Sequence, residues 1–170
     1  MERTTFSDKV FPVPVRLPRW NELPDIDLYM DQTVAFINSK VGIYVSHLGG
    51  VPLTKSMVNN YVKAKVVNAP VNKKYDRLTI AMIIVVYILK SCFSTDDIRN
   101  LIQLGIAIPG NDITYDRFCD SLENALKSVF SGSIHIDDLN EAGRESRYLM
   151  DNFSLAVACK AYVQRSFMVK

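Results

Sequence analysis

The sequence contains few of the residues from which most metal and catalytic sites are built. It has 2 histidines and 3 cysteines among 170 residues, and no CxxC pair. His47 and His135 have no cysteine or carboxylate at a ligand-like spacing, so we expect no metal site and no cofactor. The GxGxxG and Walker phosphate-binding motifs are also missing. These absences argue against an enzyme.

The chain also lacks long apolar runs and cysteine pairs. Cys92, Cys119 and Cys159 are far apart and lie in apolar contexts, which indicates reduced core residues of a cytoplasmic protein. The most apolar run, Ile80–Leu89, is half the roughly 20 residues that a membrane span needs. The N-terminus shows no basic-then-apolar leader. We therefore expect neither a signal peptide nor a membrane partner.

Positive charge is confined to one short segment. The net charge of the chain is only +2. Residues 51–77 nevertheless carry six basic side chains against Asp76 alone, and these are Lys55, Lys63, Lys65, Lys73, Lys74 and Arg77. The remainder of the chain is therefore acidic on balance. A local excess of cations in such a chain favours a partner with negative charge, nucleic acid above all.

The N-terminal part predicts an extended arm followed by a helix. Residues 1–24 contain four prolines, which lack the amide donor of a helix, and alternate apolar residues suggest that the arm lies on the body. Asp25 can then cap a helix, with Asp27 favouring its positive end. Leu28, Val34 and Ile37 give helical spacing as far as about Lys40, with residues 41–47 left open. Gly49 and Gly50 break it.

The basic segment predicts a helix-turn-helix with a short wing. Thr54 can cap a second helix that ends near Ala64, in which Met57, Val58 and Val62 recur at helical spacing on the buried side. Residues 66–75 have β-branched ends around Asn68 and Pro70, which predicts a minimal two-stranded wing or a tight loop.

The remaining sequence predicts only helices. Residues 77–91 are apolar on nearly every side and should form a central helix. Ser94 can cap the next helix, to about residue 104, and Thr114 a further one. The helix that Thr114 should cap has an apolar stripe, which consists of Tyr115, Phe118, Leu122, Leu126 and Val129. The final helix, over 145–167, places Leu149, Phe153, Ala156, Cys159 and Val163 on one face.

The predicted fold is mainly α, a winged helix-turn-helix with a small β wing packed against a C-terminal helical bundle. We divide the chain into an arm (1–24), the helix-turn-helix with its wing (25–92) and a C-terminal helical region that could mediate dimerisation (93–170).

Three other clusters favour structural interpretations. Asp25, Asp27 and Asp31 could bind a cation, but helix capping and a solvated acidic turn explain them more simply. Residues 133–137 contain Ser, His and Asp, yet adjacent residues rarely form a catalytic triad. Aromatic and methionine side chains of the C-terminal half could line an effector pocket and are more often plain core.

The helix over 54–64 presents side chains that suit DNA. Lys55, Ser56, Asn59, Asn60 and Lys63 are expected on its outer face. An asparagine amide can donate to and accept from an adenine edge in the major groove. Lysines and the capping Thr54 suit phosphate oxygens, and Lys73 and Lys74 lie at the far end of the wing. A merely solvated lysine-rich face is the alternative.

At this point the sequence resembles the MerR-type winged helix-turn-helix. Residues 53–56 fall where that family has its turn and second-helix cap, and residues 57–61 fall on its Thr-Leu-Arg-Tyr-Tyr stretch. Lys65-Val66-Val67 falls on its Gly-Leu-Ile, and Lys74-Tyr75 on the basic-Tyr unit that ends the wing. The resemblance implies DNA contacts from Tyr61 and Tyr75 as well. Asn59 and Asn60 depart from the family's Arg and Tyr at those positions.

More closely, the chain resembles an uncharacterised bacterial family of unknown function with a MerR-like fold. Residues 24–32, 53–63 and 73–75 carry this resemblance, which extends over roughly 19–165. It implies a DNA-binding transcription regulator that dimerises through its last helix. In this hypothesis Asn59 and Asn60 contact bases, while Lys55, Lys63, Lys65, Lys73 and Lys74 hold phosphates of double-stranded DNA. The alternative is a protein-interaction module that keeps the fold without binding DNA. The sequence leaves open whether an effector ligand binds.

Overall fold

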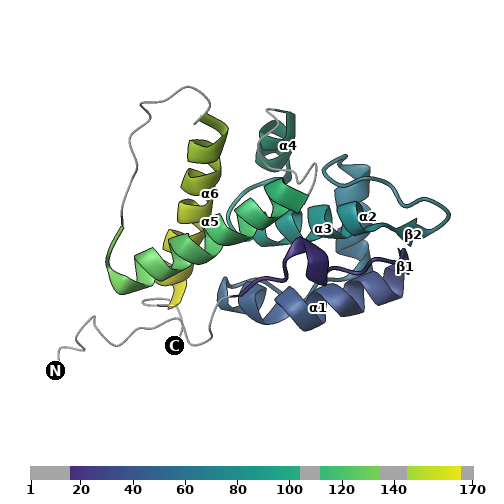
Figure 1. The fold of residues 1–170 in the computed structure, drawn as a ribbon, viewed down its shortest axis with the longest axis horizontal. Helices are drawn as coiled ribbons and strands as arrows, with labels where there is room; N and C mark the ends of the chain where they lie inside the picture. The colour runs from purple at the N-terminus through teal and green to yellow at the C-terminus, as the bar shows by residue number, and fades with distance from the viewer. Residues whose placement is uncertain (1–15, 104–111, 135–144, 166–170) are drawn as a thin grey trace.

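The computed structural model describes residues 16–103, 112–134 and 145–165, and this part of the chain is mainly helical (Figure 1). A two-stranded antiparallel sheet accompanies the helices. In chain order the elements are η2, a 3-10 helix (Trp20–Glu22), β1 (Leu28–Tyr29), α1 (Met30–His47), α2 (Lys55–Lys63), β2 (Lys74–Tyr75), α3 (Arg77–Leu89), α4 (Thr95–Gln103), α5 (Asp112–Ser131) and α6 (Glu145–Val163).

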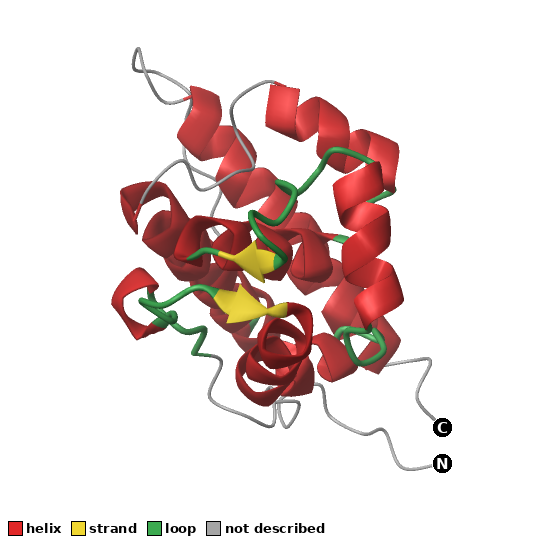
Figure 2. Ribbon diagram, turned by 90° about the vertical axis from the view of Figure 1, so that its right-hand side faces the viewer, coloured by secondary structure: helices red, strands yellow, loops and turns green. Residues whose placement is uncertain are grey.

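The chain before α1 forms a strand where a helix was predicted. Leu28 pairs with Tyr75, and Tyr29 with Lys74, so β1 and β2 lie side by side (Figure 2). The prediction that Asp25 caps the helix is wrong, because α1 begins only at Met30. The backbone amide of Tyr29 donates to the Gln32 side chain at 3.0 Å. The spacing of apolar residues could not predict β1, because the strand has only two residues and exists through its pairing with β2.

α1 continues without a break to His47, which settles the stretch left open by the sequence. Its end is a Schellman motif, in which the Gly50 amide donates to Val45 O at 2.8 Å and the Gly49 amide to Ser46 O at 3.1 Å. Gly49 has a φ of 76°, a conformation that glycine adopts without steric cost. A Cβ on Gly50 would lie 2.4 Å from a methyl carbon of Val45. The two glycines therefore terminate α1 as predicted.

The predicted two-stranded wing over 66–75 is smaller than expected. Val66 and Val67 are buried core residues outside any strand. β2 begins at Lys74, and Val71 and Lys74 form a single bridge around a two-residue turn. Asn72 and Lys73 have φ values of 50° and 65°, as a type I′ hairpin turn requires. The β-branched pair Val66-Val67 misled the prediction because it fills the core instead of a ladder.

α3 is the centre of the core. Every residue from Thr79 to Leu89 is buried, which confirms the prediction from its all-round apolar sequence. The Asp76 carboxylate caps the helix by accepting from the Thr79 amide at 2.8 Å. The helix ends at Leu89 instead of residue 91, because Lys90 is the C-cap and the following amides fold back onto Ile88 and Leu89.

The helices after α3 agree with the sequence in part. The Ser94 hydroxyl accepts from the Asp97 amide at 3.1 Å, and the Asp97 carboxylate accepts from the Ser94 amide at 3.0 Å, so the predicted cap of α4 is confirmed. The Thr114 cap is wrong, because α5 already begins at Asp112. The predicted stripe of α5, from Tyr115 to Val129, is buried throughout.

The buried face of α6 differs from the predicted one. It consists of Met150, Phe153, Ser154, Val157, Ala158 and Ala161. Of the predicted face only Phe153 is fully buried, while Leu149, Ala156 and Cys159 are half-buried and Val163 is exposed. α6 is apolar on more than one side, so its periodicity alone could not choose between them. The predicted extension to residue 167 lies outside the described residues.

The part of the arm that the structure describes lies against α5. Of the alternating apolar residues that predicted this, only Leu17 lies within the described ranges. Leu17 is buried, its amide donates to Glu123 at 2.6 Å, and the Trp20 amide donates to Asp116 at 2.7 Å. Residues 16–19 are extended, whereas Trp20–Glu22 form the 3-10 helix. No helix in the described ranges is long and apolar enough to cross a membrane.

Candidate nucleic-acid interface

α2 carries a continuous polar face on the surface of the molecule. Lys55, Asn59 and Lys63 lie at i, i+4 and i+8, and all three are exposed. Ser56 and Asn60 are exposed beside this row. Val58 and Tyr61 occupy the opposite face and are buried. A nine-residue helix could not remain folded alone in water, so its packing and end contacts must hold it.

The N-terminal end of α2 is tied to α1 and α3. The Thr54 hydroxyl accepts from the Met57 amide at 3.2 Å, which confirms the predicted cap. The Asn38 side chain of α1 donates to Leu53 O at 2.9 Å and accepts from the Leu53 amide at 2.8 Å. The Tyr87 hydroxyl of α3 donates to Val51 O at 2.7 Å. These bonds fix the direction in which α2 leaves the turn.

The C-terminal end of α2 is held by a second Schellman motif, with a lysine where glycine is usual. The Lys65 amide donates to Val62 O at 3.0 Å and the Val66 amide to Tyr61 O at 3.1 Å. Lys65 has a φ of 60°, which costs a residue with a Cβ about 1–2 kcal/mol. The Arg99 side chain of α4 donates to Ala64 O at 3.1 Å, a contact that the sequence gave no means of finding.

The lysines of this segment differ in their surroundings. Lys55 forms an ion pair with Asp31, and the Lys74 ammonium lies 5.1 Å from the centre of the Tyr29 ring. By contrast, no ion pair joins Lys63, Lys65 or Lys73 to a carboxylate within the described residues, and all three are exposed. Unpaired surface cations are available to an anionic partner without first breaking an internal contact.

Two tyrosines expected at the interface belong to the core. Tyr61 is 4% exposed and Tyr75 2% exposed, so neither side chain can contact DNA in this conformation. Burial raises the pKa of Tyr61 to about 12, with a smaller contribution from Tyr87, so its phenol is neutral at physiological pH. This burial argues against the DNA contacts that the MerR resemblance implies for these two residues, because both rings are part of the core.

One cation of the basic segment lies elsewhere. The Arg77 side chain donates to Pro24 O at 3.1 Å, and its guanidinium lies 6.0 Å from the centre of the Trp20 ring. It therefore holds the arm to the start of α3 and adds nothing to the α2 surface.

The structure also adds a residue to the surface. Asn72 is exposed at the tip of the turn, beside Lys73. Asparagine is one of the few residues that adopt positive φ readily, so the Asn-Lys pair was a turn signal that could have been recognised in the sequence.

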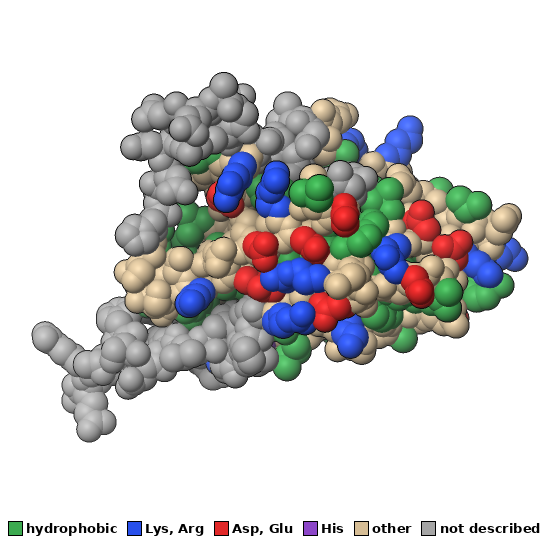
Figure 3. All heavy atoms as spheres, viewed as in Figure 1, with side chains coloured by type: hydrophobic (Ala, Val, Ile, Leu, Met, Phe, Trp, Pro, Cys, Tyr) green, Lys and Arg blue, Asp and Glu red, His purple; other side chains and the backbone are tan. Residues whose placement is uncertain are grey.

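The connection from α2 to β2 projects at the end of the molecule where the two strands pair (Figure 1). α2, Asn72 and Lys73 thus belong to one end of the fold. On the face drawn in Figure 3, acidic and basic side chains are interspersed over the middle of the molecule. That mixture is typical of a solvated surface, so it gives no reason to place an anionic partner there.

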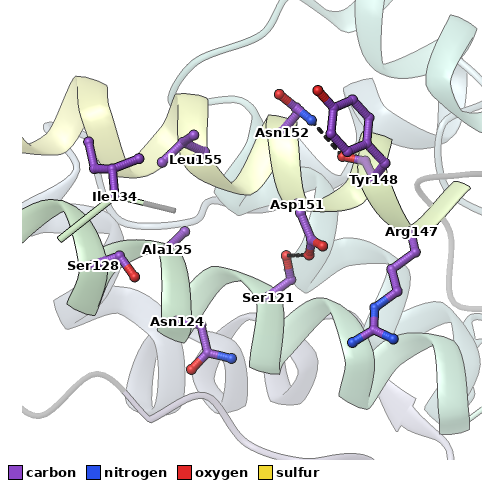
Figure 4. Close-up of a pocket in the computed structure, with 10 residues that line it drawn as sticks. All are labelled: Ser121, Asn124, Ala125, Ser128, Ile134, Arg147, Tyr148, Asp151, Asn152 and Leu155. Carbon is purple, nitrogen blue, oxygen red and sulfur yellow. Dashed lines mark hydrogen bonds between the residues drawn. The ribbon is translucent and has the colours of Figure 1, made fainter. Parts of the chain in front are cut away.

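The described part of the chain contains a small cavity but no cluster of metal ligands. No group of three or more His, Cys, Asp or Glu side chains that could hold a metal ion occurs there. A cavity of about 250 Å³ lies between α5 and α6 (Figure 4). Its Ser121 hydroxyl donates to Asp151 at 2.6 Å, and Asn152 donates to Tyr148 O at 2.8 Å, so these polar groups bind one another.

These features define a mainly helical protein with one braced, exposed polar helix. Its family is shown by residues 18–122, more than half of the chain, which match the model of a domain of unknown function, DUF1836. The chain belongs to that family. No curated protein and no solved structure matches it significantly.

Proposed function

We propose that this protein binds double-stranded DNA through α2 and the turn at Asn72-Lys73, and that it acts as a transcription regulator without catalytic activity. The observation that carries the proposal is the set of exposed, unpaired lysines, Lys63, Lys65 and Lys73, at the end of the fold that also presents Asn59 and Asn60. DNA binding depends mainly on cations that can reach phosphates, with base contacts adding specificity.

The order of the elements supports the same proposal. A short strand, two helices joined by the loop 48–54, a small hairpin turn and a strand that pairs with the first one follow each other in the chain. This order is compatible with a winged helix-turn-helix of the MerR type, with a reduced wing. In such an arrangement α2 enters the major groove and the turn contacts the neighbouring phosphates.

The strained Lys65 is a second, independent support. Glycine would relieve the positive φ at this position, yet the chain has a lysine there. Backbone strain persists where the surrounding structure enforces it, and it is common at functional positions. The αL conformation lets the chain turn while the side chain remains on the exposed surface, where a phosphate contact would account for it.

A homodimer that binds two half-sites is part of the proposal. The outer face of α6 keeps apolar residues at heptad spacing, with Leu149 and Ala156 half-buried and Val163 44% exposed. Apolar residues repeated every seven positions are suited to pairing with a second helix. Light scattering on the full chain measures this directly, since a monomeric mass contradicts the dimer.

Selection of binding sites from random DNA tests the main proposal. We expect a recovered motif, and Asn59→Ala should relax preference at one base position, since one bidentate contact discriminates by about 1–3 kcal/mol. The matched control is Asn124→Ala, an exposed asparagine of α5. If no motif is enriched after several rounds, or if the two variants have equal effects, α2 is not the element that reads the bases.

One observation favours a second function. Lys55 is already paired with Asp31, and Lys74 contacts Tyr29, so two expected phosphate contacts have internal partners. A protein-interaction module that keeps the fold could use the same face. Recovery of a stable partner protein that is unchanged by nuclease treatment and lost on Asn59→Ala would support this function over DNA binding.

A further inference from the structure

A cavity of about 520 Å³ lies directly beneath α2, larger than the one between α5 and α6. Four parts of the fold line it: the end of α1 with its glycine turn, the side of α2 that carries Met57, Asn60 and Tyr61, the end of α3 and the start of α4. Pockets for small organic ligands have volumes of about 300–1,000 Å³, so this one has the size of a ligand site.

The lining has an apolar part and a polar side. Val45, Val51, Met57 and Ala64 supply aliphatic surface, and the rings of Tyr61 and Tyr87 supply aromatic surface. Lys90, Ser91 and Thr95 lie together in the chain and form the polar side, with Asn60 across from them on α2. An apolar wall with a few grouped polar residues is the usual composition of a site for an amphipathic small molecule.

Charge around the polar side favours an anion. Lys90 lines the cavity, and no ion pair joins it to a carboxylate in the described ranges. Lys160 of α6 donates to Ser91 O, which brings a second ammonium to the same place. The nearby carboxylate of Asp97 already accepts from the Ser94 amide and hydroxyl, at 3.0 and 2.6 Å. The Lys90 ammonium thus forms no ion pair, although it is close enough to Asp97 to help lower the pKa of that carboxyl.

One wall residue has an unused hydrogen-bonding group. The Tyr61 hydroxyl is buried without a partner, whereas the neighbouring Tyr87 hydroxyl donates to Val51 O. A buried hydroxyl without a partner is unfavourable, so small movements of α2 that give it one would be stabilising.

We propose that this cavity binds a small organic carboxylate with an aromatic or branched aliphatic body. The apolar body packs against Met57, Tyr61 and Tyr87, and the carboxylate faces Lys90. Because Asn60 and Met57 belong to α2, the ligand would touch the helix that we propose contacts DNA. Ligand binding itself does not depend on that proposed function.

The test uses the full chain without DNA, so its failure and the failure of DNA binding are separate results. Isovalerate, phenylacetate and indole-3-acetate are titrated, each beside its uncharged amide, with calorimetry and NMR shifts as readouts. At least one acid should bind ten times more tightly than its amide and shift the Met57 methyl signal. If none of the three acids binds at concentrations up to about 10 mM, the proposal is overturned, because ligands of this size are expected to have a lower dissociation constant.

Two variants test the assigned contacts. Lys90→Met should lower the affinity for the acid at least tenfold and leave the affinity for the amide unchanged. Lys127→Met, at an exposed lysine of α5, should change neither affinity. Val51→Trp should fill the mouth of the cavity and abolish binding of acid and amide together, with an unchanged melting temperature. Equal loss in the two lysine variants, or full binding by a folded Val51→Trp protein, contradicts the site.

Discussion

The two basic regions of this molecule use their cations in different ways. In the arm, the Arg19 guanidinium bonds Glu123 at 2.7 Å and Asp120 at 2.8 Å, and Arg16 bonds Glu22 at 2.9 Å. At the α2 end, Lys63, Lys65 and Lys73 have no carboxylate partner among the described residues. Arg19 holds the arm to α5, Arg16 pairs within the arm, and the lysines face solvent.

The difference shows which charges the fold itself needs. Arg16 and Arg19 are each matched by a carboxylate, and Arg19 lies in a partly buried position against α5. The three lysines have no ion-pair partner in the part of the chain that the structure describes, and Lys65 even occupies a backbone conformation unfavourable to it. We therefore expect substitutions of the arm arginines to change stability and substitutions of the three lysines to change DNA binding.

The largest expected effect is on DNA affinity. Charge reversal of Lys63, Lys65 and Lys73 to Glu removes up to three phosphate contacts and adds repulsion, so affinity should fall about a hundredfold or more. Fluorescence anisotropy on a labelled duplex measures it. The control reverses Lys40, Arg117 and Lys127, exposed cations of α1 and α5. Equal loss in the two triple variants would mean that only net charge matters, which contradicts a localised surface.

The next effect is on stability in the arm. The side chains of Arg19 and Glu123 are 23% and 18% exposed, so Arg19→Met leaves a partly buried carboxylate without its main partner. We expect a loss of about 2 kcal/mol in urea unfolding, below the 3–5 typical of fully buried pairs. Arg16→Met, in a pair exposed at 64% and 40%, should leave stability nearly unchanged. Similar losses for both would show that burial does not separate them.

A smaller effect on stability is expected at Tyr87 and Tyr61, where removal of the hydroxyl should act in different directions. The Tyr87 hydroxyl donates to Val51 O, so Tyr87→Phe should cost about 1 kcal/mol. The Tyr61 hydroxyl is buried without a partner, so Tyr61→Phe should leave stability unchanged or raise it slightly. Chemical denaturation of both variants measures the difference. A larger loss for Tyr61→Phe would reveal an interaction of its hydroxyl that the structure does not contain.

The smallest effect separates folding from binding at a single residue. Lys65→Gly should stabilise the protein by about 0.5–1 kcal/mol, because glycine has no Cβ penalty at positive φ. The same change should reduce the slope of log affinity against log salt by about 0.9, the contribution of one phosphate contact. Unfolding and salt titrations are made on the same preparation. An unchanged slope would show that Lys65 contacts no phosphate and is not part of the DNA-binding surface.

Much of this fold follows from local patterns in the sequence. The caps at Thr54 and Ser94, the glycine end of α1 and the buried α3 could be predicted because each depends on neighbouring residues or on uniform apolarity. β1 could not, because its two residues are a strand only through pairing with β2, far along the chain. The face of α6 was mistaken because several of its sides are apolar.

The candidate site was predictable in composition but not in detail. The exposed face of α2 follows from helical spacing and a single cap. The burial of Tyr61 and Tyr75, the pairing of Lys55 with Asp31 and the bond from Arg99 to Ala64 O depend on elements that only the tertiary fold brings together. The family match to DUF1836 identifies relatives and carries no function with it.

The salt dependence of DNA affinity tests the central claim most directly. The wild-type chain is titrated with a duplex from the site selection over a range of salt concentrations. If Lys63, Lys65 and Lys73 each contact a phosphate, log affinity should fall with log salt with a slope of about −2.7 or steeper. A slope near zero, or no binding below about 10 μM at low salt, contradicts α2 and its turn as a DNA-binding surface.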